Sequence, residues 1–591
     1  MIRDTFLPAL WLAAALTMPA SAQTPAAATD AHTALQSLLA DEWERGLRES
    51  PESATGSGDH RFDDRWTDLS LSAIAAREQG DRAALARARA IDRHALGDND
   101  RVDYDTFLWQ IERTVERQKF REVLEPIHHQ GGVQTADSIV EVSRFANRDD
   151  YRHYLARLAA LPVLVEQAIV LMQEGLKAGI QPPRVLMQRV PAQIAAQVVD
   201  DPAKSPFYRA LQHWPDAVPA AERAALQRDA QALIRERVVP AYRRLQVFFE
   251  RDYLPRARVS VAVADRPDGK AYYDFLTRYY TTTNLNAEQI HAIGLAEVAR
   301  LREAMDKVKT ETGFKGTMAE FFTFLRTDPR FFRPTPAALL ETYRAVAKRI
   351  DPELVKAFRR IPRLPYGVRA IPDNVAADTT AAYYLNGAPD GSRPGYYYVN
   401  LYKPESRPTW EMVPLTLHEA VPGHHLQFAR ALEFENASMF RKTAYFVAYG
   451  EGWALYAEQL GYEMGLYDDP YDRFGQLTYE MWRAVRLVVD TGMHVKGWTR
   501  ERAIAYFKDN AAKTDQDIVN EIDRYIDTPA QALAYKIGQM KISELRARAA
   551  RELGPKFDLR DYNDEVLATG SVPLAALEAR IASWIETRRA P

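Results

Sequence analysis

Residues 418 to 425 concentrate side chains that bind metal ions. They read His-Glu-Ala-Val-Pro-Gly-His-His and hold three of the twelve histidines in this chain of 591 residues. Neutral imidazoles hold zinc, and a neighbouring carboxylate can take a proton from the water that attacks a substrate. The composition of this segment therefore predicts a hydrolytic zinc site.

The spacing of these histidines differs from that of the common H-E-x-x-H motif, in which two histidines lie one helical turn apart. Four residues after His418 the chain has Pro422, and the next histidines are His424 and His425. A continuous helix would separate His418 from His425 by about 10 Å, too far for one ion to contact both. Either the segment binds no metal, or Pro422 and Gly423 interrupt the helix and fold a later histidine back.

A catalytic zinc ion needs three protein ligands and one open position. The apolar, helix-like stretch 445–460 has Glu451 and Glu458 as its only acids, seven residues apart and therefore on one face. Acids on such a helix are costly unless a cation satisfies them. We expect Glu451, whose flanking glycines leave room for close approach, as the third ligand, and Glu458 as the acceptor for a ligand imidazole N–H. The alternative is that both acids pair with arginines at an interface.

Two further side chains are candidates for stabilising the oxyanion that forms when water attacks a carbonyl group. They are His494 and Tyr535. For His494, a structural role in a hydrogen bond is equally consistent with the sequence. Arg483 and Arg486 lie one turn apart and could receive a substrate carboxylate, although such arginines more often form salt bridges at a surface.

The overall composition narrows the class of protein. The 77 basic and 80 acidic residues give a net charge of −3, so nothing indicates binding to nucleic acid or to an anionic membrane. Cysteine is absent, which excludes disulfides, a thiol nucleophile and a lipid-modified cysteine.

The amino terminus resembles a secretory signal. Arg3 precedes an apolar run over 6–18, and Ala20-Ser21-Ala22 fits the cleavage pattern. We therefore expect cleavage after Ala22, a disordered linker over 23–30, and a periplasmic or secreted protein that does not insert into the membrane after signal removal.

Helical periodicity dominates the rest of the chain. It predicts helices within 31–49, 68–96, 101–125, 148–178, 219–251 and 287–308, some opening with capping residues such as Asn147 and Asn286. Strand-like patterns are scarce and are clearest at 258–263 and 395–401. The sequence therefore predicts a mainly α protein with a small sheet, forming one domain over 31–591 with a soft subdivision near 255–285.

The Tyr-rich stretch 395–401 ends seventeen residues before His418. We expect it to be an edge strand beside the metal-site helix, where an extended substrate could bind by backbone pairing. Aromatic packing within a small sheet is the alternative.

The chain resembles the bacterial domain-of-unknown-function 885 (DUF885) family, exported or lipoprotein-like proteins that share a His-Glu-x-x-Pro-Gly-His-His segment. The resemblance covers roughly residues 30 to 580 and includes the segments 268–273, 281–285, 290–295, 450–454, 490–494 and 534–538. That family is similar to helical gluzincin peptidases, which are prolate two-lobed bodies with a deep cleft over the zinc and accept short peptides.

Some zinc peptidases of this kind carry an H-E-x-x-G-H variant. Placing Gly423 and His424 on its Gly-His pair implies that His424 is the second ligand and His425 a neighbour, and the reverse assignment stays open.

These inferences together predict an exported zinc-dependent hydrolase that cleaves short peptides. His418, His424 and Glu451 would hold one Zn²⁺, Glu419 would act as the general base, and His494 or Tyr535 would stabilise the oxyanion. Two alternatives are a zinc amidase acting on cell-wall material and a non-catalytic periplasmic binding or scaffold protein with a degenerate or structural metal site.

Overall fold

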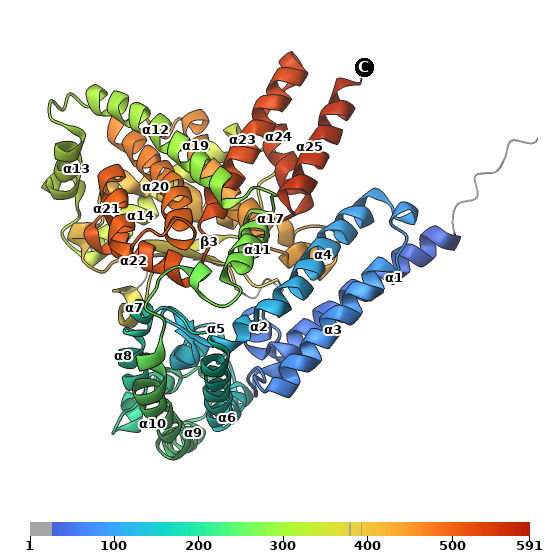
Figure 1. Cartoon of the computed structure of the whole chain (residues 1–591), viewed down its shortest axis with the longest axis vertical. Coiled ribbons are helices and arrows are strands. Elements are labelled where there is room, and N and C mark those ends of the chain that lie inside the picture. Colours follow the sequence, from blue (N-terminus) through green and yellow to red (C-terminus); the bar gives the residue numbers. More distant parts are fainter. Residues whose placement is uncertain (1–25, 378–379, 390, 392, 591) are drawn as a thin grey trace, which may run out of the picture.

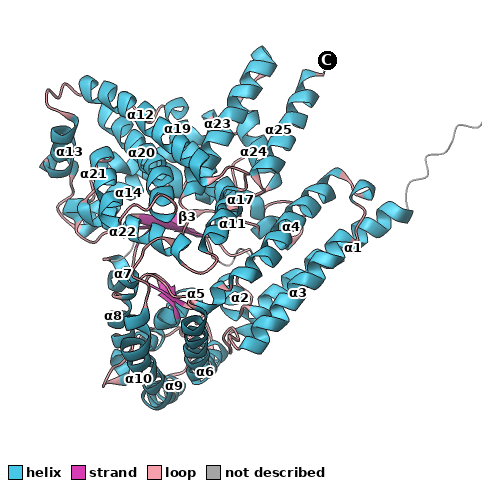
Figure 2. Cartoon of the chain, viewed as in Figure 1, coloured by secondary structure: helices cyan, strands magenta, loops and turns pink. Residues whose placement is uncertain are grey.

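The protein is almost entirely helical, with one two-stranded and one three-stranded sheet among the described residues (Figure 2). The computed structural model describes residues 26–377, 380–389, 391 and 393–590. The predicted mainly α class is confirmed. The predicted signal sequence, 1–22, lies outside the described residues.

Three groups of helices follow one another along the chain (Figure 1). The N-terminal arm consists of α1 (Ala26–Glu49), α2 (Pro51–Gly56), α3 (Leu71–Arg89) and α4 (Asp98–Arg117). The lower lobe contains α5 (Ile139–Val142), α6 (Arg148–Ala178), α7 (Arg184–Met187), α8 (Val190–Ala195), α9 (Ala220–Leu233) and α10 (Val239–Phe248).

The upper body contains the remaining helices and the candidate site. These are α11 (Gly269–Thr281), α12 (Ala287–Glu311), α13 (Met318–Thr327), α14 (Pro336–Ile350), α15 (Asp373–Ala376), α16 (Met412–Glu419), α17 (His424–Leu432), α18 (Met439–Thr443), α19 (Val447–Met464), α20 (Pro470–His494), α21 (Arg500–Asn510), α22 (Asp515–Asp527), α23 (Leu533–Leu553), α24 (Leu559–Val566) and α25 (Leu574–Arg589).

Each region in which the sequence predicts a helix contains one. Asn147 caps α6 by accepting hydrogen bonds from the amides of Asp149 and Asp150, and Asn286 caps α12 in the same way through Gln289. The disordered linker predicted over 23–30 is wrong for its described part, because α1 already begins at Ala26. Ala26, Ala27 and Ala28 have the highest helix propensity of any residue type and extend the helix towards the N-terminus.

One helix among the described residues, α6, is long and apolar enough to cross a membrane by length and composition alone. Half of its most apolar window is buried inside the protein, where the helix packs against α9 and α10. The core helices of soluble proteins have the same character.

The three-stranded sheet differs from the prediction. Its strands are β3 (Tyr366–Ala370), β4 (Ala382–Leu385) and β5 (Gly395–Val399), in the order β3-β5-β4. The predicted strand at 395–401 exists as β5, but its expected edge position is wrong, because β3 pairs with it in parallel and β4 pairs with it antiparallel. The edge strands are therefore β3 and β4.

The strand predicted at 258–263 is also wrong. Only Arg258 makes a single bridge, to Pro183, and the segment then turns into a short 3₁₀ helix. Its backbone is held by side chains instead, since the Val263 amide donates to the His494 imidazole and the Arg258 guanidinium donates to the Ala262 carbonyl. An alternating pattern cannot reveal the absence of a partner strand.

Candidate metal centre

The histidine-rich segment forms a break between two helices. Helix α16 ends at Glu419, and α17 begins at His424. Between them Gly423 packs so tightly that a Cβ atom there would lie 1.9 Å from the carbonyl oxygen of His418. The indole of Trp453 on α19 holds the break in place by donating to the Pro422 carbonyl (2.9 Å). Pro422 and Gly423 therefore fold the chain back on α16, as the motif requires for metal binding.

This fold-back brings His418 and His424 next to Glu451 of α19. The Glu451 Oε2 atom lies 3.6 Å from His418 Nε2 and 3.4 Å from His424 Nε2. All three ligand atoms lie within 4.8 Å of one another, and all three residues are buried or nearly so. The structure thus unites the three side chains that the sequence nominated as ligands.

The geometry of this cluster fits a zinc ion. Ligand atoms held at about 2.0–2.1 Å in a tetrahedron are separated by about 3.3–3.4 Å, close to the two distances from Glu451. The buried Glu451 Oε2 atom has no hydrogen-bond partner among the described residues, although a buried unpaired carboxylate oxygen is costly. A cation between the three side chains would satisfy it. Two histidines and one glutamate are also a ligand set that catalytic zinc sites use.

Glu458 contacts the ring nitrogen of His418 that does not face Glu451, as its spacing on the helix predicted. Its Oε1 atom is 2.8 Å from His418 Nδ1. An ionised carboxylate only accepts hydrogen bonds, so Nδ1 carries a proton, and a metal ion that displaced the other ring proton would bind the Nε2 lone pair facing Glu451. This orientation by a carboxylate is typical of metal-bound histidines.

The electrostatics of the cluster favour positive charge. Burial alone would lower the pKa of His418, but its interactions with Glu451 and Glu458 outweigh burial and raise that pKa to about 9. Burial alone would raise the pKa of Glu451, whereas its interactions with His424 and His418 lower it well below the ordinary value. The carboxylates of Glu451 and Glu458 thus stabilise positive charge between the histidines, and a metal ion would supply such a charge.

The variant Glu458→Gln should weaken zinc binding by about 10- to 100-fold, because the neutral amide orients His418 but no longer raises its basicity. Competition titration with a chromophoric chelator measures the change. The control is Glu463→Gln, on the same helix but paired with Arg546 away from the cluster. Equal zinc affinity in the two variants would contradict the role of Glu458.

Glu419, the predicted general base, ends α16 and lines a cavity beside the cluster. Its carboxylate forms no hydrogen bond or ion pair with any described residue, although only 8% of the residue is exposed. A free carboxylate at this position can accept a proton from a water molecule held at the cluster.

Tyr445 is a site residue that the sequence did not single out. Its hydroxyl donates to Glu451 Oε1 (2.9 Å), which leaves Oε2 to face the histidines. Its ring packs on Gly450, where a Cβ atom would lie 2.2 Å from the ring. Gly452 lies against Gly538 of α23, where a Cβ atom would come within 2.5 Å of backbone. The glycines beside Glu451 therefore allow Tyr445 and α23 to pack closely against α19. They do not make the room for the metal that the sequence suggested.

The cluster opens into a cavity of about 1620 Å³ lined by both the lower lobe and the upper body. His418, Glu419, His424 and Glu451 lie in its wall, together with Tyr535 of α23. The Tyr535 ring stacks parallel to the His418 ring at 6.5 Å, and its hydroxyl accepts a hydrogen bond from Arg524 (2.9 Å). Its own O–H proton is therefore free to point into the cavity.

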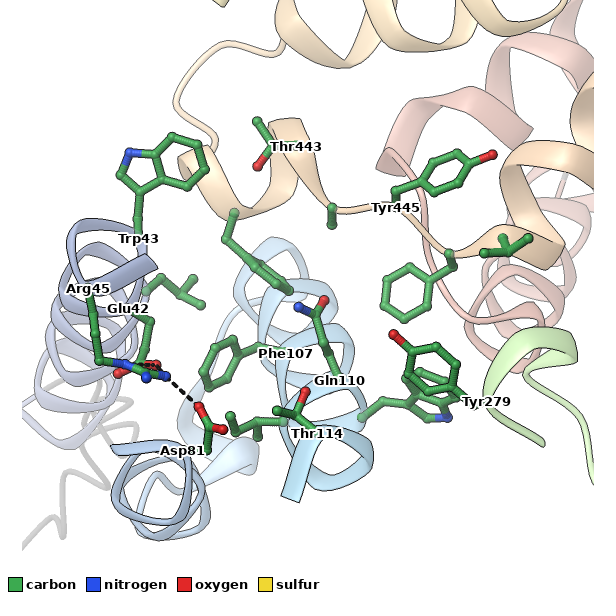
Figure 3. Close-up of a pocket in the computed structure, with 17 residues that line it drawn as sticks. Glu42, Trp43, Arg45, Asp81, Phe107, Gln110, Thr114, Tyr279, Thr443 and Tyr445 are labelled. Carbon is green, nitrogen blue, oxygen red and sulfur yellow. Dashed lines mark hydrogen bonds and ion pairs between the residues drawn. The ribbon is translucent and has the colours of Figure 1, made fainter. Parts of the chain in front are cut away.

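A second cavity, of about 380 Å³, lies between the N-terminal arm and the segment that joins α18 to α19. Figure 3 shows it with Gln110 and Thr114 on α4 and with Thr443 and Tyr445 on its upper wall. Thr443 and Tyr445 also line the large cavity. Aromatic and polar side chains share the lining of this smaller space, and none of the histidines of the cluster belongs to it.

His494 does not belong to the site, so its predicted role at the oxyanion is wrong. It is fully buried and is absent from the cavity wall. One ring nitrogen accepts from the Val263 amide (3.1 Å) and the other donates to the Tyr525 carbonyl (3.0 Å). Burial lowers its pKa to about 4, so it is neutral and structural.

The His425 side chain makes different contacts from that of His424. Its Nε2 donates to the Leu364 carbonyl (3.0 Å), and its Nδ1 accepts from the Tyr384 hydroxyl (2.8 Å). Burial lowers its pKa to about 4. His425 therefore ties α17 to the sheet through Tyr384 of β4, which leaves His424 as the histidine facing Glu451.

Arg483 and Arg486 of α20 both line the cavity, and neither is at the surface. Arg483 lies 3.5 Å from Glu458, and Arg486 forms an ion pair with Glu521 (2.9 Å). Arg524 of α22 lines the same side of the cavity, and the sequence did not predict it. No local pattern marks it, since its position depends on how α22 packs against α20 and α23.

Comparisons with known proteins agree with this architecture. A family model described as "Bacterial protein of unknown function (DUF885)" matches residues 51–581. The chain belongs to the DUF885 family. Among solved structures, this chain is similar to "the putative lipoprotein from Colwellia psychrerythraea", which is 28% identical over 95% of this chain and 99% of that one, with a TM-score of 0.88.

A second solved structure, "a putative lipoprotein of unknown function from Shewanella oneidensis", shares 18% identity with this DUF885 chain. It covers 93% of this chain and 99% of its own, with a TM-score of 0.70, and so shares the fold. The search of curated proteins found no match.

Proposed function

We propose that this DUF885 protein is an exported zinc-dependent metallopeptidase that cleaves short peptides and resembles the helical gluzincins. The observation that supports this best is the meeting of His418, His424 and Glu451 at the wall of a large cavity, with the unpaired carboxylate of Glu419 beside them. When bound there, zinc would polarise a substrate carbonyl group and make water more acidic.

In this proposal, side chains of the protein transfer the proton and stabilise the negative charge that develops during hydrolysis. Glu419 accepts the proton of the attacking water and passes it to the leaving amine as the C–N bond breaks. Tyr535 donates its O–H to the carbonyl oxygen on which negative charge develops. The edge strand β4, whose residues line the cavity, offers unpaired backbone groups to an extended peptide.

Export is proposed on two grounds. The first 22 residues have the composition of a secretory signal, and two proteins of similar structure are described as putative lipoproteins. Because this chain has no cysteine to carry a lipid, we propose a soluble periplasmic form.

Metal content tests the proposal directly. Purified, undialysed protein should contain one zinc ion per chain by mass spectrometry, and His418→Ala or His424→Ala should lose it. The matched variant His425→Ala should keep zinc, because the two ring nitrogens of His425 bond to Tyr384 and to the Leu364 carbonyl. Zinc that is substoichiometric and indifferent to His418→Ala would favour a non-catalytic binding protein.

Substrate profiling separates the remaining possibilities. A peptide library and a set of muropeptides would be incubated with the zinc-loaded protein. Cleavage of peptides alone supports a peptidase, whereas cleavage of muropeptide amides alone would reassign the protein as a cell-wall amidase.

Tyr535 and His494 should respond differently to substitution. Tyr535→Phe should lower kcat by about 10²-fold with zinc content unchanged, since it removes one oxyanion donor. His494→Gln should leave kcat within a few-fold of the wild type and lower the thermal midpoint, because two buried backbone groups lose well-placed partners. A large loss of kcat in a stably folded His494→Gln protein would restore His494 to the catalytic site.

A further inference from the structure

Three arginines form one wall of the large cavity next to the metal centre. Arg483 and Arg486 come from α20 and Arg524 from α22, and we refer to the three as the arginine wall. The Arg486 guanidinium lies 4.2 Å from the centre of the Tyr535 ring, and Arg524 donates to the hydroxyl of that ring. Because Tyr535 stacks beside His418, the arginine wall stands one side chain away from the proposed ligands.

The arginine wall carries more positive charge than its neighbours neutralise. Arg486 and Arg524 share one carboxylate, that of Glu521, at 2.9 and 3.5 Å. Arg483 faces Glu458 at 3.5 Å, but the same oxygen already accepts the hydrogen bond of His418. Three guanidinium groups therefore meet two carboxylates, of which one is committed to the metal centre.

Some hydrogen-bond donors in the arginine wall also lack an acceptor among the described residues. Arg483 Nε and Arg486 Nη1 are buried and have no hydrogen-bond partner among the described residues. Arg524 is the member that ligands can reach, since 19% of its side chain is exposed. Guanidinium groups removed from water without full pairing are unfavourable, so this wall favours an incoming anion.

Three other arginines line the cavity, namely Arg189, Arg209 and Arg393. Arg209 pairs with Asp137 and Glu141, both at 3.0 Å, on the lower lobe. Arg189 pairs with Asp523, which also pairs with Arg500, and Arg393 donates to the carbonyls of Asn386 and Gly56 without an acidic partner among the described residues. What distinguishes the arginine wall is therefore its position next to Tyr535 and the metal centre.

We infer that the arginine wall binds the C-terminal α-carboxylate of the substrate, so that the protein is an exopeptidase acting at the C-terminal end of short peptides. The inference rests on the proposed peptidase function. A planar guanidinium matches the two oxygens of a carboxylate. Arg524 lines the cavity and is partly exposed there, with its Nη2 donating to Tyr535 and Gln531 and its Nη1 3.5 Å from Glu521. An extended peptide advances about 3.3–3.6 Å per residue, so a wall this close to the metal centre suits a C-terminus one or two residues beyond the cleaved bond.

Paired peptides test the inference. The two members of a pair are identical except that one ends in a carboxylate and the other in a carboxamide. The wild type should hydrolyse the carboxylate form with a kcat/KM about 10²-fold higher, because the amide leaves charged partners unsatisfied. Arg524→Gln should remove most of this preference, and Arg209→Gln, on the opposite wall, should retain it. Equal cleavage of both peptides by the wild type would overturn the inference.

A binding experiment distinguishes this inference from the proposed function itself. Calorimetry would measure both peptides against Glu419→Gln protein with and without zinc. We expect the carboxylate peptide to bind about tenfold more tightly, with this preference lost in the Arg524→Gln background and partly kept with Arg524→Lys. Selective binding without any hydrolysis by the wild type would support the arginine wall while refuting the peptidase. Equal binding of both peptides would refute the arginine wall whatever the activity.

Discussion

Replacing Glu419 with glutamine is expected to lower kcat by about 10²- to 10⁴-fold while leaving zinc content unchanged. The amide cannot accept the proton of the attacking water, and general-base catalysis contributes a factor of this size. Zinc should remain because Glu419 is not one of the three proposed ligands and its carboxylate forms no hydrogen bond or ion pair with any described residue. The measurement combines turnover of a substrate found by library profiling with metal analysis of the same preparation.

The control for this variant is Glu435→Gln, an exposed glutamate that forms no hydrogen bond or ion pair among the described residues. Its activity should equal that of the wild type. Full activity of Glu419→Gln on every substrate would show that another group accepts the proton. Loss of zinc together with activity would instead make Glu419 part of the metal site.

The parts of the site that the sequence could predict are those governed by local geometry. Glu451 and Glu458 share a face because both lie on α19, seven residues apart. The fold-back at Pro422 and Gly423 was required by the spacing of His418 and His424, and the structure shows the break in the helix there.

The failures come from contacts between residues far apart in the sequence. His494 looked catalytic, but its two nitrogens bond to the backbone of Val263 and Tyr525, which no spacing on its own helix reveals. The strand β5 has the expected pattern, yet its central position depends on pairing with β3 and β4, two strands that the sequence did not predict. Arg524 was missed for the same reason.

The two histidines at the end of the motif lie in the same turn of α17 but contact different parts of the protein, the metal centre and the three-stranded sheet. His424 faces Glu451, while His425, on the next position of α17, bonds to Leu364 and Tyr384 beside the sheet. The sheet edge that lines the cavity is therefore positioned by the residue next to a proposed ligand. This arrangement couples the placement of β4 to the placement of the metal centre.

The largest structural effect is expected from Gly423→Ala. A Cβ atom at this position would lie 1.9 Å from the His418 carbonyl oxygen and 2.5 Å from that of Leu417, both backbone atoms that cannot rotate away. The break between α16 and α17 would have to open, and His424 would move away from Glu451. We expect a loss of about 2–4 kcal/mol in stability and zinc content well below one ion per chain.

Thermal unfolding and metal analysis of the purified variant measure these two effects. The control is Gly46→Ala in α1, where a Cβ atom meets nothing within 4 Å and the substitution should be neutral or slightly stabilising. A Gly423→Ala protein with normal stability and a full complement of zinc would mean that His424 reaches the metal without the tight fold-back. The second ligand would then have to be assigned anew, because the proposed centre depends on this single close contact between the turn and the end of α16.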